Sequence, residues 1–312
     1  MSCGGWVGHA SPPRRTLFRN LVKKTRPPPG DAPGSFWRGR APLMIPPPLV
    51  TFFVFVFGAI LGSFLNVCIL RIPLGQSILH PPSRCAACGV PIPGFFNLPI
   101  VGYFLLQGRS RCCGAHLDPR YPMVEAGTAF ALAALWTLYP PELFGIYALL
   151  VSGLIVASAI DLDYLVIPDF LTIGGVVAGI SLSYLFPALQ GKQDPVDAMI
   201  RSSLSAAIAG GALWLVARTA SWFLQKEAMG IGDAKLLAAL GAFLGWPSLP
   251  FLLAVSSLIG TAVGIGILNK RKQKLGIKVP YGPYLALAAL LWLLGGMNLF
   301  SKYLSNNFIQ NV

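Results

Sequence analysis

Charged residues are scarce in this sequence of 312 residues, and acidic residues are the scarcest among them. Only 11% of the residues are charged, and 11 Asp and Glu residues stand against 24 Lys and Arg residues. Soluble domains usually contain about 25% charged residues. Because so few charges cannot cover a soluble fold, the composition excludes a soluble globular domain.

Long apolar runs take the place of the missing charge, and 54% of the residues are hydrophobic. Runs such as 50–68, 143–160 and 251–268 are long enough to cross about 30 Å of hydrocarbon as helices. We therefore expect an all-α integral membrane protein with about eight transmembrane helices. The expected spans are 49–68, 123–139, 143–160, 170–187, 199–223, 234–247, 249–268 and 281–298.

The basic residues are also distributed as in a membrane protein. They lie at the ends of the apolar runs and form no continuous basic stripe, so we expect lipid and no nucleic acid around the chain. The connection 269–280 contains five Lys and Arg residues, and the positive-inside rule places it in the cytoplasm. Counting back through the spans places 224–233, 161–169 and the polar segment 69–122 on the same side.

The first 48 residues contain eight basic residues and one acid with many Pro and Gly, and we expect them to be disordered. They lack the apolar core of a secretory signal. With segment 69–122 inside the cell, the first span would export this basic extension, against the usual charge bias. We therefore expect the natural polypeptide to begin at Met44 and residues 1–43 to have no functional role. The alternative is a real cytoplasmic or periplasmic tail.

The polar segment 69–122 is rich in Pro and Gly and holds four of the six cysteines. The four, Cys85, Cys88, Cys112 and Cys113, are clustered in a way that is more typical of metal binding than of a disulfide framework. We expect a small folded module on the cytoplasmic side. The expected organisation is an extension at 1–48, a first transmembrane helix at 49–68, the cysteine module at 69–122, a transmembrane bundle at 123–298 and a tail at 299–312.

Five of the acids lie where an expected span begins or ends. Asp161, Asp163 and Asp169 fall between the third and fourth spans, Asp233 closes a Gly-Ile-Gly-Asp motif before the sixth span, and Glu125 opens the second. An ionisable group at the end of a membrane helix costs free energy unless it reaches water or a partner. These acids are therefore functional candidates. Among the other acids, Glu142, Asp194 and Asp197 need no role beyond solvating outward loops.

Simple structural roles suffice for two of the five. Asp169 follows a proline and suits an N-cap or first-turn acid, and Asp163 suits a solvated loop acid. Asp161 and Asp233 differ, because the topology brings them to the same membrane face from different helices. Two adjacent carboxyls share a proton, so that one activates water as a base while the other polarises a carbonyl. The pair is therefore a candidate catalytic site for peptide hydrolysis.

Several segments together resemble the type IV prepilin peptidases, membrane aspartic proteases with a Gly-x-Gly-Asp signature. The resemblance covers residues 49–298 in the expected order. The matching segments are GSFLNV at 62–67 with RIP at 71–73, SRCAACG at 83–89, PRYPMVE at 119–125, DLDYLVIPD at 161–169, GIGDAK at 230–235 and PYGPY at 280–284.

The resemblance implies two activities at the cytoplasmic face of a bacterial inner membrane. The first is cleavage of the leader peptide of type IV prepilins or type II secretion pseudopilins, with Asp161 and Asp233 as the catalytic pair by motif position. The second is N-methylation of the new amino terminus with S-adenosylmethionine, associated with the cysteine module. The sequence identifies no pocket for this methyl donor. The segments at 62–66 and 120–125 could serve only helix packing or folding.

The cysteine module departs from the family pattern of two Cys-x-x-Cys pairs, which suits tetrahedral zinc. Cys85 and Cys88 form the first pair, but the second begins with Ser110 and ends with Cys113. A serine hydroxyl is a poor zinc ligand, so Cys112 or His116 would have to complete the site. We expect a structural zinc ion on this set. The alternative is a set of reduced cysteines in a module held by packing.

Two other functions stay open at this point. One is a peptidase whose altered module no longer methylates its product. The other is a polytopic transporter or assembly scaffold in which Asp161 and Asp233 carry protons or pair with cations. Transporters place ionisable groups near the middle of the membrane, whereas these acids lie at helix ends. The sequence therefore favours an aspartic endopeptidase that is also an S-adenosylmethionine-dependent N-methyltransferase.

Overall fold

A computed structural model describes residues 48–80, 83–85, 87–93, 98–225, 230–271 and 280–296. The regular secondary structure of the described residues is helical, with no strand and only isolated bridges that pair Arg84 with Pro91 and Arg109 with His116. The α-helices are α2 (Pro48–Arg71), α3 (Val101–Leu105), α4 (Arg120–Leu138), α5 (Pro141–Tyr164), α6 (Asp169–Leu185), α7 (Pro195–Leu224), α8 (Ile231–Leu244), α9 (Leu249–Arg271) and α10 (Gly282–Leu291). Short helical turns follow α6, α8 and α10, at Pro187–Gln190, Trp246–Ser248 and Trp292–Gly296.

Each of the eight expected spans overlaps one of these helices, with bounds that differ by a few residues. Within the described part of the chain, four helical segments are both long and apolar enough to cross a membrane: Pro48–Arg71, Pro141–Tyr164, Pro195–Phe223 and Trp246–Ile267. Asp169–Leu185 and Gly282–Gly296 are shorter apolar helices. The expected all-α membrane fold is therefore confirmed, while the number of eight crossings stays a prediction. Residues 1–47, which include the expected start at Met44, lie outside the described residues.

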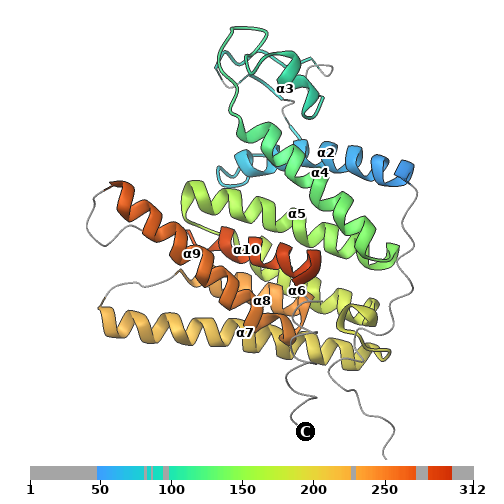
Figure 1. Ribbon diagram of the computed structural model, residues 1–312, viewed down its shortest axis with the longest axis vertical. Helices are drawn as coiled ribbons and strands as arrows, with labels where there is room; N and C mark the ends of the chain where they lie inside the picture. The colour runs from blue at the N-terminus through green and yellow to red at the C-terminus, as the bar shows by residue number, and fades with distance from the viewer. Residues whose placement is uncertain are drawn as a thin grey trace, which may run out of the picture.

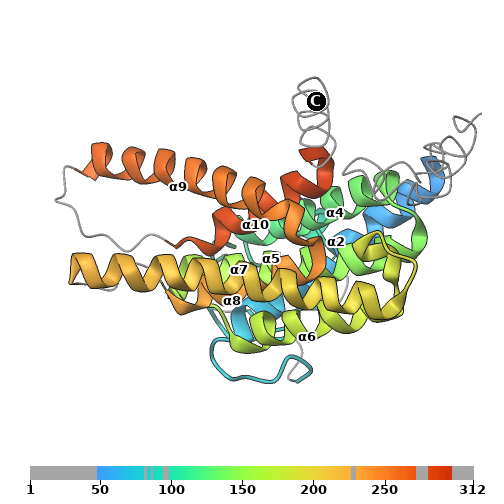
Figure 2. The same ribbon diagram turned by 90° about the horizontal axis from the view of Figure 1, so that it is seen from below.

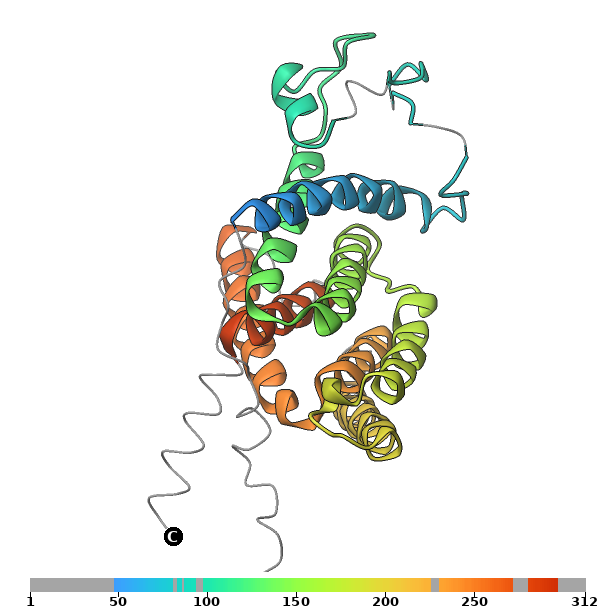
Figure 3. The same ribbon diagram turned by 90° about the vertical axis from the view of Figure 1, so that its right-hand side faces the viewer.

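The long helices pack side by side, and the segment that contains α3 projects away from them beside α2 (Figures 1 and 3). Figure 2 shows α7 and α9 running along the bundle with α10 and α8 beside them. α8 is central to the packing, because ten of its 14 residues are buried, and the described core includes Leu237 and Leu240 of this helix. This burial fixes the position of Asp233 at the start of α8.

The first helix approaches α4 closely because it has glycine at the crossing. A methyl group on Gly62 would lie 2.7 Å from the Cα atom of Glu125, so no larger residue fits without moving the helices. The Asn66 side chain donates a hydrogen bond to the Tyr121 carbonyl oxygen, at 3.1 Å, in the first turn of α4. The two family-like segments at 62–67 and 119–125 are therefore in contact with each other.

The start of α7 is capped by a side chain. Asp194 was expected only to solvate an outward loop, but its carboxylate accepts a hydrogen bond from the Asp197 backbone N–H at 2.8 Å. Asp194 is thus the N-cap of α7, and Pro195 occupies the first helical position where its missing N–H costs nothing.

Candidate active site

Asp161 lies in the last turn of α5 and only 5% of it is exposed. The backbone N–H of Gly282, at the start of α10, donates a hydrogen bond to Asp161 Oδ2 at 3.0 Å. A methyl group on residue 282 would lie 2.8 Å from the same oxygen, so glycine is needed for this approach. The PYGPY segment, which had no assigned role in the sequence, thus supplies a direct partner of the carboxyl.

Asp233 lies in the first turn of α8 and is also buried, with 8% exposed. Ile167 packs against two glycines, Gly232 beside Asp233 and Gly282 beside Asp161. Methyl groups on Gly232 and Gly282 would lie 3.5 Å from Ile167 Cβ and 3.1 Å from Ile167 Cδ1, respectively. The two carboxyls are close enough to interact electrostatically. The structure therefore brings together the two acids that the sequence singled out as a pair.

The two neighbouring acids form ion pairs at the same helix ends. Arg120 donates two hydrogen bonds to Asp163, at 2.6 and 2.8 Å, and Lys235 lies 2.6 Å from Asp169 Oδ1. Asp169 is in the first turn of α6, as expected, but Asp163 is in the last turn of α5 and is not a free loop acid. Sequence reasoning missed both cations, because each comes from a distant segment.

The four clustered cysteines meet in the module. The sulfur atoms of Cys85, Cys88, Cys112 and Cys113 all lie within 4.8 Å of one another. Zn–S bonds of about 2.3 Å in a tetrahedron place the sulfurs about 3.8 Å apart, so the set is compact enough for one zinc ion. Cys112, and not His116, completes the set among the described residues. Ser110 donates or accepts a hydrogen bond with Cys113 at 3.1 Å and stays beside the set.

The thiols of this set differ in their readiness to become ligands. The backbone N–H of Cys88 lowers the pKa of the Cys85 thiol to about 6. The Ser110 hydroxyl lowers the pKa of the Cys113 thiol. The hydrogen bond with Cys112 raises the pKa of the Cys88 thiol to about 12. Thiolate is the form that binds metal, so Cys85 offers a charged ligand at neutral pH, and a bound dication would deprotonate the others.

A cavity of about 930 Å³ lies between the module and helices α2 and α4. Its wall includes Ser63 and Asn66 of α2, Tyr121 and Glu125 of α4, and Tyr164 of α5. Glu125 is buried, and its Oε2 accepts a hydrogen bond from the Ile100 backbone N–H at 2.7 Å. The segments at 62–66 and 120–125, which identified no pocket in the sequence, therefore line the same one.

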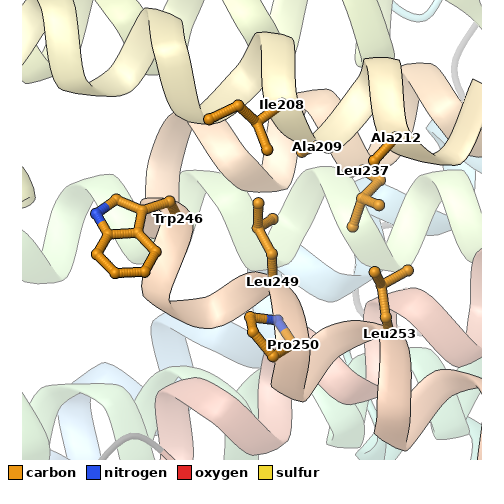
Figure 4. Close-up of a pocket in the computed structure, with 8 residues that line it drawn as sticks. All are labelled: Ile208, Ala209, Ala212, Leu237, Trp246, Leu249, Pro250 and Leu253. Atoms are coloured by element: carbon orange, nitrogen blue, oxygen red, sulfur yellow. The ribbon is translucent and has the colours of Figure 1, made fainter.

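A smaller cavity of about 290 Å³ lies among α7, α8 and α9 (Figure 4). Figure 4 shows apolar side chains around it, among them Ile208, Leu237 and Trp246. It contains no group that could donate or accept a proton in a reaction. It is therefore not a candidate for the chemistry of the molecule.

A pair of buried carboxyls at the ends of apolar helices is the arrangement expected of a membrane aspartic peptidase, and the comparisons with known proteins place the chain in this class. Two family models match the chain, one described as the bacterial peptidase A24 N-terminal domain at residues 56–139 and one as the type IV leader peptidase family at residues 148–265. The chain belongs to the type IV leader peptidase family, as the sequence segments predicted, and is a multi-pass inner membrane protein.

Curated relatives agree with this assignment. The chain is 36% identical over 278 residues to a prepilin leader peptidase/N-methyltransferase of Aeromonas hydrophila. The matched region covers 81% of this chain and 93% of the relative. A protein of the same name from Pseudomonas aeruginosa is 34% identical over 275 residues, covering 80% of this chain and 91% of the relative. One from Myxococcus xanthus is 39% identical over 225 residues, covering 70% and 63%. No solved structure matches the chain.

Proposed function

We propose that this protein cleaves the leader peptide from type IV prepilins or type II secretion pseudopilins at the cytoplasmic face of the inner membrane, and then N-methylates the new amino terminus. The observation that carries the proposal is the meeting of Asp161 and Asp233, both buried, at the ends of α5 and α8. The names of the relatives support both activities.

The hydrogen bond from Gly282 suggests how the two carboxyls divide the work. A backbone N–H that points at one oxygen of Asp161 stabilises negative charge on that carboxyl. Asp161 would therefore be the base that takes a proton from water, while Asp233 keeps its proton and gives it to the oxygen of the scissile carbonyl.

The proton balance closes over the whole reaction. Water attacks the carbonyl carbon as Asp161 accepts its proton and Asp233 protonates the carbonyl oxygen. The C–N bond then breaks as Asp161 passes its proton to the leaving amine, and Asp233 takes one back from a hydroxyl of the intermediate. The products are a carboxylic acid and a free amino terminus, and both carboxyls regain their first states.

The cysteine set would hold a structural zinc ion through Cys85, Cys88, Cys112 and Cys113. Such an ion would brace loops that contain no strand or long helix among the described residues. S-adenosylmethionine supplies a methyl group on a sulfonium centre when it is bound. The chain's own task in methylation is to place the new amino terminus next to it and to exclude water.

Membranes that contain the protein, incubated with a prepilin and radiolabelled S-adenosylmethionine, test the proposal. We expect a shortened pilin that carries label. Cleavage without label would reduce the function to a peptidase whose module no longer methylates. Absence of cleavage with an authentic prepilin would contradict the proposal as a whole. Membranes that contain the Asp233→Asn variant are the matched control, and they should give neither product.

A further inference from the structure

The cavity beside the cysteine module is large enough for a small-molecule ligand, since ligand pockets commonly measure about 300–1,000 Å³. Its wall joins four parts of the chain: the end of α2, the start of α4, the loops of the module and the last residue of α5. Cys85 and Cys112 also contribute to the wall, so the sulfur cluster lies against the cavity. A ligand here would contact both the module and the membrane helices.

Glu125 places a buried acidic side chain in the wall of this cavity. It is the buried member of the charged residues that line the cavity, because 8% of it is exposed while Arg84, Arg111 and Asp118 are exposed. No Lys or Arg forms an ion pair with it among the described residues. A buried carboxylate without a cation is costly. A ligand with a positive centre would supply the missing partner.

The backbone of Ile100, which donates a hydrogen bond to the Glu125 carboxylate, is strained. Ile100, whose N–H binds Glu125, has φ 61° and ψ −57°, which is the centre of a γ-turn and is rare for a branched residue. The turn is closed by a hydrogen bond from the Val101 N–H to the Pro99 carbonyl oxygen at 2.5 Å. Backbone strain of this kind is concentrated at functional sites.

The rest of the wall suits an adenosyl amino acid better than a basic peptide. The described charged residues of the wall include three arginines, Arg71, Arg84 and Arg111, which would repel a basic leader and attract a carboxylate. Tyr103 and Tyr121 provide aromatic faces for a flat ring. A molecule with a cationic centre, a carboxylate and a heteroaromatic ring matches all three features.

The cavity also lies next to the proposed peptidase site. Tyr164 contributes to its wall and is three residues after Asp161 in α5. Between them, Asp163 pairs with Arg120 at the start of α4, the helix that carries Glu125. A newly formed amino terminus would therefore reach the cavity by a short movement along the end of α5.

We propose that this cavity binds the methyl donor S-adenosylmethionine, with the Glu125 carboxylate facing its sulfonium. The inference rests on the methylation half of the proposed function and assigns it a site. It makes Glu125 a binding residue for the donor, and it gives the two family-like segments at 62–66 and 120–125 a shared purpose.

The charge contact is tested by comparing two probes on the full-length protein in nanodiscs. S-adenosylmethionine carries the sulfonium charge and S-adenosylhomocysteine does not. Glu125→Gln keeps the shape of the side chain and its ability to accept from Ile100, but removes the charge. We expect it to weaken S-adenosylmethionine binding by about tenfold or more and S-adenosylhomocysteine binding by less than about threefold, as loss of one charged contact implies. An equal loss for both probes, or no loss, would overturn the contact.

The location is tested by filling the cavity. Val67→Phe adds a ring to the cavity wall from α2, and Val56→Phe adds the same ring to the same helix at a site outside the lining. We expect the first variant to lose binding of both probes and the second to bind them as the wild type does. Wild-type binding by Val67→Phe would overturn the location. If the wild-type protein binds neither probe, the methylation half of the proposed function falls together with this inference. If the wild-type protein binds the probes, and Glu125→Gln and Val67→Phe bind them equally well, this inference alone is overturned and the proposed function stands.

Discussion

The two chemically active regions of this molecule are built in different ways. Asp161 and Asp233 lie at the ends of long packed helices, and their described neighbours are the Gly282 backbone and Ile167. The four cysteines lie in loops that, within the described residues, are ordered by isolated bridges and by turn hydrogen bonds such as Cys85 N–H to the Val90 carbonyl oxygen. The carboxyl pair thus takes its geometry from helix packing, whereas the cysteine set takes its geometry from loops and turns. Perturbations should therefore damage one region and spare the other.

The largest expected effect comes from the dyad itself. Asp161→Asn or Asp233→Asn removes one of two groups that must exchange protons, so prepilin cleavage should fall by about 10²- to 10⁴-fold for each. The metal content of the module should not change. Asp163→Asn and Asp169→Asn, which remove only ion pairs, are the matched controls and should keep at least part of the activity. Full cleavage by either dyad variant, at a normal level of protein, would refute the assignment.

The next effect comes from the glycine that contacts Asp161. In Gly282→Ala the added methyl group would lie 2.8 Å from Asp161 Oδ2, so the carboxyl or the start of α10 must move. A displacement of about 1 Å costs about 10²-fold in rate at a catalytic site, and we expect a loss of this size in the cleavage rate. Gly264→Ala is the control, because nothing lies within 4 Å of its added methyl group. Equal activity of the two variants would remove Gly282 from the site.

A change in the cysteine set should have the opposite pattern. Cys85→Ser removes one ligand, and we expect loss of zinc, easier proteolysis within the module and loss of methylation, while cleavage persists. Metal analysis of the purified protein measures the first effect. Cys68→Ala, which removes a buried cysteine of α2 outside the set, should keep the metal. A wild-type protein that contains no zinc under mild purification would argue against the metal site.

The smallest expected effect is a gradual loss of zinc from the cysteine set as the pH falls. The folded pKa of Cys85 is about 6, lowered from 9.0, so its thiolate contributes to stability at neutral pH and this contribution is lost as the pH falls through about 6. We expect zinc to be retained on dialysis at pH 7.5 and released progressively toward pH 5, because protons compete for the sulfur atoms. Release that increases with pH over the same range would have the wrong sign for a thiolate site.

Much of this architecture follows from the sequence, for reasons that are local. Apolar runs predict the helices, and the alternation of spans places Asp161 and Asp233 on one face. Contacts between distant segments could not be predicted in the same way. The Gly282 amide reaches Asp161 across 121 positions, and Lys235 reaches Asp169 across 66. No periodicity in the sequence encodes such distances.

The module shows the same limit. The spacing left Cys112 and His116 as alternative fourth ligands, and only the three-dimensional arrangement of the sulfurs favours Cys112. The cavity could not be predicted from the sequence either, because Ser63 and Glu125 become neighbours only when α2 crosses α4 at Gly62. Local patterns predict elements, while sites that lie between elements need the packing.

The intact mass of a prepilin after incubation with S-adenosylmethionine and the protein tests the central claim that one chain holds two separable sites. The account predicts a shortened, methylated pilin with the wild type, an unchanged precursor with Asp233→Asn, and a shortened pilin that is largely unmethylated with Glu125→Gln. A shortened pilin produced by Asp233→Asn at the wild-type rate would contradict the account.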